Sequence, residues 1–228
     1  LIKENGKTFS WGGKYSHNFD QRDTLFTDLG VFEKFSPKID KSKFDKPILF
    51  LANIQPQLQM QVINQLDDAS LIVMDTMNLW IDNCLNELKA VIKKVNILLI
   101  NEEEIVDLTG IDNLYKAGLS ILNDGPQYVI IKKGSKGSLI VSKEDNIVIP
   151  AVPNIDVFDP TGAGDSFAGG FLGYLSKNDK IDLIGAVIHG TAIASYTVSG
   201  FGIEAIEKIK FNNIKNRVKL LQELIKEN

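Results

Sequence analysis

The residues best suited to chemistry lie in one short stretch, 159–167, which reads Asp-Pro-Thr-Gly-Ala-Gly-Asp-Ser-Phe. Pro160 fixes its own φ and blocks an earlier helix, while Gly162 and Gly164 allow backbone angles or close approaches that a β-carbon would forbid. We therefore predict a helix that begins near Gly164. A helix N-terminus presents unpaired N–H groups and the positive end of the macrodipole, so this turn can hold an anion, typically phosphate.

Asp165 places a carboxylate in this anion-binding turn, and it has two interpretations. An aspartate in a first helical turn ordinarily caps the helix. Here a second acid, Asp159, and the hydroxyl of Thr161 crowd the same turn. Such a group suits a site where a hydroxyl loses a proton beside a phosphate, which favours Asp165 as a general base.

Residues 159–171 resemble, without a gap, the C-terminal signature of the ribokinase-like (PfkB-type) carbohydrate and nucleoside kinases. The resemblance implies that Asp165 takes the proton from the acceptor hydroxyl, and that the amides of Gly162, Ala163 and Gly164 form an anion hole. It also implies ATP as co-substrate. The implied fold is α/β and ribokinase-like, with a mostly parallel central sheet flanked by helices and a small β lid.

A second motif, Asn101 to Glu104, contains three consecutive acids after an apolar run. Alone, such acids mark a solvated first helical turn that complements the helix dipole. The spacing is similar to the family's Asn-Xaa-Xaa-Glu motif, which implies that Asn101 and Glu104 order Mg²⁺ through water. Mg²⁺ keeps most of its waters and needs only a carboxylate or two besides phosphate oxygens.

The nucleotide site rests on weaker signals. Gly134 and Gly137 are typical of a tight turn. The resemblance places this turn along the nucleotide phosphates and ribose, with Lys132 or Lys136 adding positive charge. His189 reads as a packed core or rim residue, and by resemblance its helix borders the adenine.

The resemblance also allows a monovalent cation, K⁺, at Asp159 and Thr161 together with the loop 199–202.

Apolar runs that alternate with helical patterns must position these residues. The predicted strands are 48–53, 71–76, 97–101, 128–132, 138–142 and 146–151. The predicted helices are 56–66, one capped by Asp82 and running to 94, one from 164, one capped by Asp182 over 183–198, and 214–226. Buried strands alternating with helices predict a mostly parallel sheet covered on both faces, with ligands at the strands' carboxyl ends. Four polar residues fall at that edge: Asn53, Asp75, Asn78 and Asn101.

Residues 1–35 carry strand-like pieces at 7–11 and 24–29 around a polar loop that includes His17, and Asn5-Gly6 predicts a hairpin turn. This region is either part of the β lid or an edge hairpin whose aromatic side chains pack on the main domain. Residues 36–228 are predicted as the α/β nucleotide-binding and catalytic domain. Nothing matches the family's first βαβ region with its Gly-Gly motif and substrate-gripping aspartate, so we expect an N-terminal part to be missing.

Composition excludes several classes of function. The chain has 228 residues, 44% hydrophobic and 24% charged, and a net charge of −4, so no basic surface indicates a nucleic-acid partner. One cysteine, Cys84, excludes an internal disulfide, and two histidines make no zinc cluster. No apolar run approaches membrane-spanning length, which favours a cytoplasmic protein.

We therefore predict a kinase that transfers the ATP γ-phosphoryl group to a hydroxyl of a sugar or nucleoside, with Asp165 as general base. The alternative is a nucleotide-binding protein without catalysis, either a fragment that lacks its acceptor site or a regulatory relative. A phosphatase using the same anion hole lacks an identifiable nucleophile. The acceptor stays open, as does the choice between monomer and homodimer.

Overall fold

The structure is a computed structural model that describes residues 3–16, 22–178 and 180–227. The chain divides into two compact units, Leu1–Ile39 and Asp40–Asn228.

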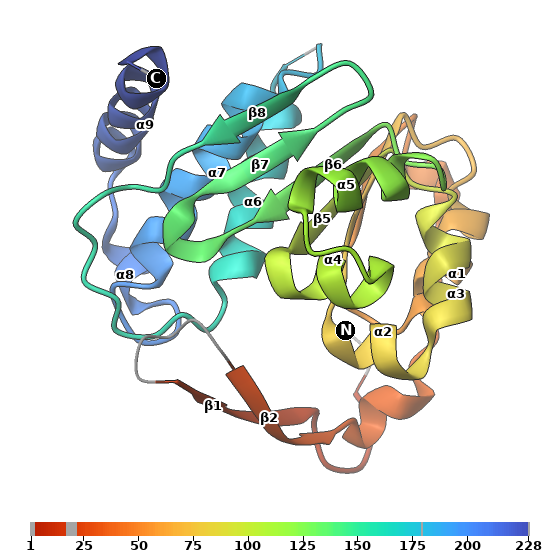
Figure 1. Ribbon diagram of the computed structural model, residues 1–228. Coiled ribbons are helices and arrows are strands. Elements are labelled where there is room, and N and C mark those ends of the chain that lie inside the picture. Colours follow the sequence, from red (N-terminus) through yellow and green to blue (C-terminus); the bar gives the residue numbers. More distant parts are fainter. Residues whose placement is uncertain (1–2, 17–21, 179, 228) are drawn as a thin grey trace. The chain divides into compact units, whose positions relative to one another are not determined.

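The larger unit is built on a six-stranded sheet whose spatial order follows the sequence (Figure 1). The strands are β3 (Ile48–Leu51), β4 (Leu71–Asp75), β5 (Ile97–Asn101), β6 (Tyr128–Lys132), β7 (Ser138–Val141) and β8 (Asn146–Ile149). β3 to β6 are parallel, while β7 and β8 each run antiparallel to the preceding strand. The predicted mostly parallel sheet is confirmed.

Helices cover both faces of this sheet (Figure 1). On one face, Val73, Leu99 and Ile130 from three neighbouring strands pack with Phe167 and Phe171 of α6 in one buried cluster. α7 and α9 add to the same cluster, and the opposite face carries α1, α3, α4 and α5. The helices are α1 (Pro56–Gln65), α2 (Asn78–Asn83), α3 (Leu85–Ile92), α4 (Glu102–Thr109), α5 (Leu114–Leu122), α6 (Ala163–Leu175), α7 (Leu183–Thr197), α8 (Glu204–Lys208) and α9 (Phe211–Glu227).

Side-chain caps mark the starts of α4, α5 and α7. The Asp182 side chain accepts a hydrogen bond from the Gly185 N–H, as an N-cap should. The prediction that Asp82 caps a single long helix is wrong. Asp82 lies inside α2, a separate six-residue helix that buries Ile81, and α3 starts only after Cys84.

The smaller unit is a two-stranded antiparallel sheet of β1 (Ser10–Tyr15) and β2 (Arg22–Asp28), followed by the 3₁₀ turn η1 (Gly30–Lys34). The predicted hairpin turn at Asn5-Gly6 is wrong. Residues 3–9 form no strand, and the Lys7 carbonyl instead accepts from the Val31 N–H. His17, in the predicted polar loop, lies outside the described residues. The lid role of residues 1–35 stays a prediction.

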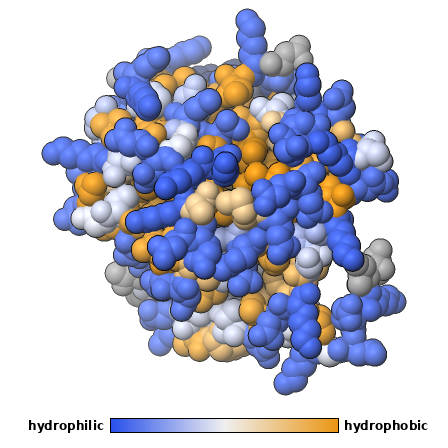
Figure 2. Space-filling view, turned by 90° about the vertical axis from the view of Figure 1, so that its right-hand side faces the viewer, coloured by the Kyte–Doolittle hydropathy of each residue, from blue (hydrophilic) through white to orange (hydrophobic). Residues whose placement is uncertain are grey.

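The surface shows mainly hydrophilic side chains with hydrophobic groups between them on the face seen in Figure 2. Among the described residues, no helix combines the length and the apolar character that a membrane span requires.

Candidate active site

The turn before α6 adopts the geometry that its glycines predict. Gly162 has φ 81° and is the N-cap, so α6 begins at Ala163, one residue before the predicted start. The Thr161 N–H donates to Asp159 Oδ1 at 2.9 Å, so the Asp159 carboxylate closes the turn.

Two of the three amides predicted for the anion hole are available. The Ala163 N–H donates to the Pro160 carbonyl at 3.1 Å. In the part of the chain that the structure describes, the N–H groups of Gly162 and Gly164 have no acceptor. These two donors lie at the positive end of a 13-residue helix, which is an environment that favours an anion.

Asp165 lies in the first turn of α6, where its side chain is partly exposed to solvent. Within residues 3–16, 22–178 and 180–227, no cationic group comes within 4.0 Å of its carboxylate. Partial burial raises the pKa of Asp165, repulsion from Asp75 adds to the rise, and attraction to Lys132 opposes it. A carboxylate with a raised pKa is a better proton acceptor than an ordinary aspartate.

Beneath this turn lies a buried ion pair that joins two strand ends. The Lys132 ammonium at the end of β6 donates to both carboxylate oxygens of Asp75 at 3.0 Å, at the end of β4. The two side chains are only 16% and 8% exposed. A β-carbon added at Gly164 would lie 3.6 Å from Lys132 Nζ, which places the ammonium directly against the start of α6.

The charge of Lys132 is stabilised by the acids around it. Burial by itself would lower the pKa of Lys132, but attraction to Asp75 and Glu104, hydrogen bonding to Asp75 and attraction to Asp165 together raise it. Lys132 is therefore a permanent cation at this edge of the sheet.

Asn101 and Glu104 form a capping box at the start of α4. The Glu104 N–H donates to Asn101 Oδ1 at 2.7 Å, and the Asn101 N–H donates to Glu104 Oε2 at 3.0 Å. Glu104 is only 4% exposed. One carboxylate and one amide oxygen fit a Mg²⁺ ion that keeps most of its waters and binds phosphate oxygens. The magnesium role stays a prediction, and the box by itself explains both residue types.

The Gly134–Gly137 turn is a tight connection between β6 and β7. Gly134 and Gly137 have φ 55° and 84°, and a β-carbon at Gly137 would clash with the Ile149 carbonyl oxygen. The Lys133 N–H donates to the Gly137 carbonyl at 2.8 Å. Glycine is therefore required here by the backbone, and nucleotide binding by this turn stays a prediction.

His189 is engaged in local contacts on α7. Its Nδ1 lies 2.7 Å from the Gly185 carbonyl oxygen, and its ring stacks on Tyr174 with 4.3 Å between the ring centres. The Tyr174 hydroxyl donates to Asp182 at 2.6 Å. These contacts satisfy the histidine structurally, and its predicted contact with the adenine remains untested.

The structure thus brings Asp165, Lys132 and the first turn of α6 together. The predicted cation site at Asp159 and Thr161 lies just before this turn, and it stays a prediction. The sequence patterns did not predict the ion pair between Asp75 and Lys132. Its only signal was that both residues end apolar runs predicted as parallel strands.

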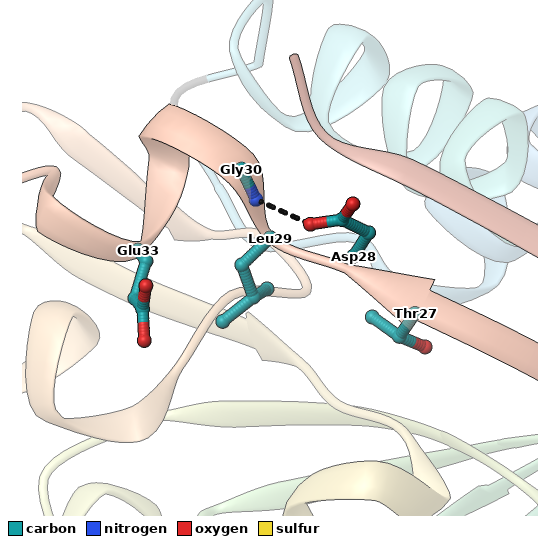
Figure 3. A pocket seen from close by; sticks show the side chains of 5 residues that line it. All are labelled: Thr27, Asp28, Leu29, Gly30 and Glu33. Carbon is teal, nitrogen blue, oxygen red and sulfur yellow. Dashed lines mark hydrogen bonds between the residues drawn. The ribbon is translucent and has the colours of Figure 1, made fainter. Parts of the chain in front are cut away.

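A separate pocket of about 380 Å³ lies in the smaller unit (Figure 3). Its lining includes two carboxylates, Asp28 and Glu33, and none of the predicted site residues. Asp28 Oδ1 accepts from the Gly30 N–H at 3.0 Å, so this carboxylate closes the turn at the end of β2.

Comparison with solved structures identifies the fold. The nucleoside kinase of Methanocaldococcus jannaschii, described as an archaeal member of the ribokinase family, superposes with a TM-score of 0.76 at 24% identity. The match covers 95% of this chain and 70% of that chain. A Burkholderia thailandensis nucleoside kinase in complex with inosine gives a TM-score of 0.77 at 18% identity with the same coverage. The predicted ribokinase-like fold is confirmed.

The family follows from the sequence match. Residues 47–209 match the model of the pfkB family of carbohydrate kinases, and the chain belongs to that family. A cytidine kinase of Thermococcus kodakarensis is 27% identical over 161 residues, which is 68% of this chain and 57% of that protein. The nucleoside kinase of M. jannaschii is 28% identical over 171 residues, 75% of this chain and 55% of that protein. The chain therefore spans just over half the length of these curated relatives.

Proposed function

We propose that the protein carrying this chain is an ATP-dependent kinase that phosphorylates a hydroxyl of a nucleoside or sugar. The observation that carries the proposal is the start of α6. There, a carboxylate with a raised pKa lies beside two N–H groups that have no acceptor among the described residues. A proton acceptor and an anion-binding turn are the two parts that transfer of a phosphoryl group to a hydroxyl requires.

In the proposed reaction, Asp165 takes the proton of the acceptor hydroxyl as its oxygen forms a bond to the γ-phosphorus. The bond from that phosphorus to the bridging oxygen breaks, and ADP leaves with the electron pair. The N–H groups of Gly162 and Gly164 hold the charge on the transferring phosphoryl group. Base catalysis typically contributes roughly 10²–10⁴-fold in rate.

Mg²⁺, when bound, neutralises charge on the phosphate oxygens. Asn101 and Glu104 are proposed to hold its water shell, and Asp159 and Thr161 a monovalent cation. The turn at Gly134 and Gly137 and the rim at His189 are proposed to bind the nucleotide.

A nucleoside acceptor is favoured over a simple sugar, because two relatives that each match more than two thirds of the chain are named cytidine kinase and nucleoside kinase. Other relatives that match about half of the chain or less are named deoxyribokinase and fructokinase. A sugar acceptor is therefore the second candidate.

The test is ADP release from Mg-ATP by the full-length protein, across cytidine, adenosine, inosine, ribose, deoxyribose and fructose. We expect one acceptor to raise ADP release well above the rate with ATP alone. ATP binding without stimulation by any acceptor would instead support the non-catalytic nucleotide-binding alternative.

A further inference from the structure

We propose that Asp75 is a positioning residue of the phosphoryl-transfer site, which holds the Lys132 ammonium beneath the first turn of α6 so that this ammonium binds the terminal phosphate of the nucleotide. This inference rests on the proposed function and extends it to a residue at the end of β4.

The position of the ammonium is set by two bonds to one rigid carboxylate. Both oxygens of Asp75 accept from Lys132 Nζ at 3.0 Å, and Asp75 Oδ1 also accepts from the Thr76 N–H at 3.0 Å. A lysine side chain is flexible and loses much rotamer entropy when it is held in one place. Asp75 therefore fixes a charge that would otherwise sample many positions.

The held ammonium retains a donor that has no acceptor among the described residues, and it lies close to the anion site. A lysine ammonium has three N–H donors. Two of them reach Asp75, and within the described parts of the chain the third has no acceptor. A β-carbon at Gly164 would lie 3.6 Å from Nζ, so the ammonium lies against the first turn of α6.

The surrounding charges favour an anion that arrives together with a cation. Three carboxylates act on Lys132, which are Asp75 at the end of β4, Glu104 in α4 and Asp165 in α6. Three negative charges around one positive charge leave the cluster negative. Mg²⁺ that accompanies a nucleotide offsets part of the phosphate charge, and a phosphate oxygen gives the third donor of the ammonium an acceptor.

Stability alone is a weak explanation for this ion pair. A buried pair is often no more stable than well-packed apolar residues of similar volume, since desolvation offsets the attraction. A purely structural pair would also need no free donor close to the start of α6.

The test is calorimetric binding of Mg-AMP-PCP, an ATP analogue that cannot transfer its terminal phosphate, and of Mg-ADP, to the full-length protein. The variants are Lys132→Met, Asp75→Asn and the double variant. The double variant keeps the shape of the pair and leaves no unpaired charge, so it remains testable if a single variant folds poorly. Lys219→Met is the control, because it removes a lysine from an exposed ion pair on α9 with Glu223.

We expect the double variant to lose about tenfold to a hundredfold in affinity for AMP-PCP, as for one charged hydrogen bond, and much less for ADP. Asp75→Asn alone should weaken AMP-PCP binding, whereas in the Lys132→Met background it should change this affinity by less than about twofold, because Asp75 acts through Lys132. The control should bind both nucleotides as the wild type does.

Three results would overturn the inference. They are wild-type AMP-PCP affinity in the double variant, an equal loss of ADP and AMP-PCP affinity, or a further loss when Asp75→Asn is added to Lys132→Met. None of these results would contradict the proposed function, provided that an acceptor still stimulates ADP release by the wild type. If the wild-type protein binds neither nucleotide, the proposed function fails first and the inference fails with it.

Discussion

The end of β4 and the start of α6 each carry an aspartate at the same edge of the sheet. The two aspartates differ in their exposure to solvent and in their bonding partners. Asp75 is 8% exposed and accepts from Lys132 and from the Thr76 N–H. Asp165 is exposed, and no cation lies within 4.0 Å of it in the described residues. The difference teaches that bonding partners decide the role of each aspartate: Asp75 holds a lysine in place, whereas Asp165 is a carboxylate that is open to a substrate.

The largest expected effect is on stability, and it concerns the buried pair. Lys132→Met leaves the Asp75 carboxylate buried without its cation, and should lower the free energy of unfolding by about 3–5 kcal/mol. The double variant Asp75→Asn with Lys132→Met should recover most of this loss, because no charge is left uncompensated. Urea denaturation followed by circular dichroism measures both. The exposed control Lys219→Met should stay within about 0.5 kcal/mol of the wild type, and an equally small effect of Lys132→Met would contradict the distinction between the two sites.

The next effect is on turnover, and it concerns Asp165. Asp165→Asn should lower kcat about a hundredfold while ATP affinity is retained, because the amide cannot accept the hydroxyl proton. Steady-state ADP release gives kcat, and calorimetry gives the affinity. Near-normal turnover would remove Asp165 as the base.

The same variant should not lower stability at pH 7. The folded-state pKa of Asp165 is raised above 3.8, so the folded protein binds more protons than the unfolded chain between the two pKa values. This contribution to stability is fully present below pH 3.8 and is lost as pH rises through the folded-state pKa. At pH 7 the ionised Asp165 is less favourable in the folded protein than in the unfolded chain. Asp165→Asn removes this unfavourable ionised group, so the melting temperature of the variant at pH 7 should equal or exceed that of the wild type. A clear loss of stability would show that Asp165 has a structural partner.

A third pair of substitutions separates the magnesium role of Glu104 from its capping role. Glu104→Gln keeps a side chain that can complete the capping box but removes the charge, so the Mg²⁺ concentration for half-maximal activity should rise with little change in stability. Asn101→Ala removes the cap and should cost about 1 kcal/mol. A Mg²⁺ titration at fixed ATP and a thermal melt of each variant measure these effects. An unchanged Mg²⁺ titration in Glu104→Gln would leave the capping box as the sole explanation of the motif.

The smallest expected effect is on the pH profile, and it tests the coupling between the two aspartates. The acidic limb of kcat/KM should lie above pH 3.8, because Asp165 must be deprotonated to act as a base and its pKa is raised. Lys132 lowers and Asp75 raises that pKa. Lys132→Met should therefore move the acidic limb of the kcat/KM profile to higher pH, and Asp75→Asn should move this limb to lower pH. Shifts in the same direction would mean that the two charges do not act on Asp165 separately.

Local patterns predicted much of the fold and the turn that opens α6. The apolar runs predicted the parallel strands because a strand buried on both faces needs continuous hydrophobic residues. Asp182 predicted the start of α7, and the glycines of residues 162–164 predicted the turn before α6, because both features depend on neighbours in sequence. Where a local pattern was compatible with two different local structures, the prediction was wrong, as Asn5-Gly6 and Asp82 show.

The sequence by itself determined the turn at Gly162 and the aspartate that follows it, because backbone angles and helix ends are set by a few consecutive residues. Only the tertiary structure decided that Lys132 reaches Asp75. The two residues are 57 positions apart and lie on strands separated by β5, so their contact depends on strand order, register and the reach of a lysine side chain. Burial of these two charges likewise depends on α6 packing over the sheet, which no local pattern contains.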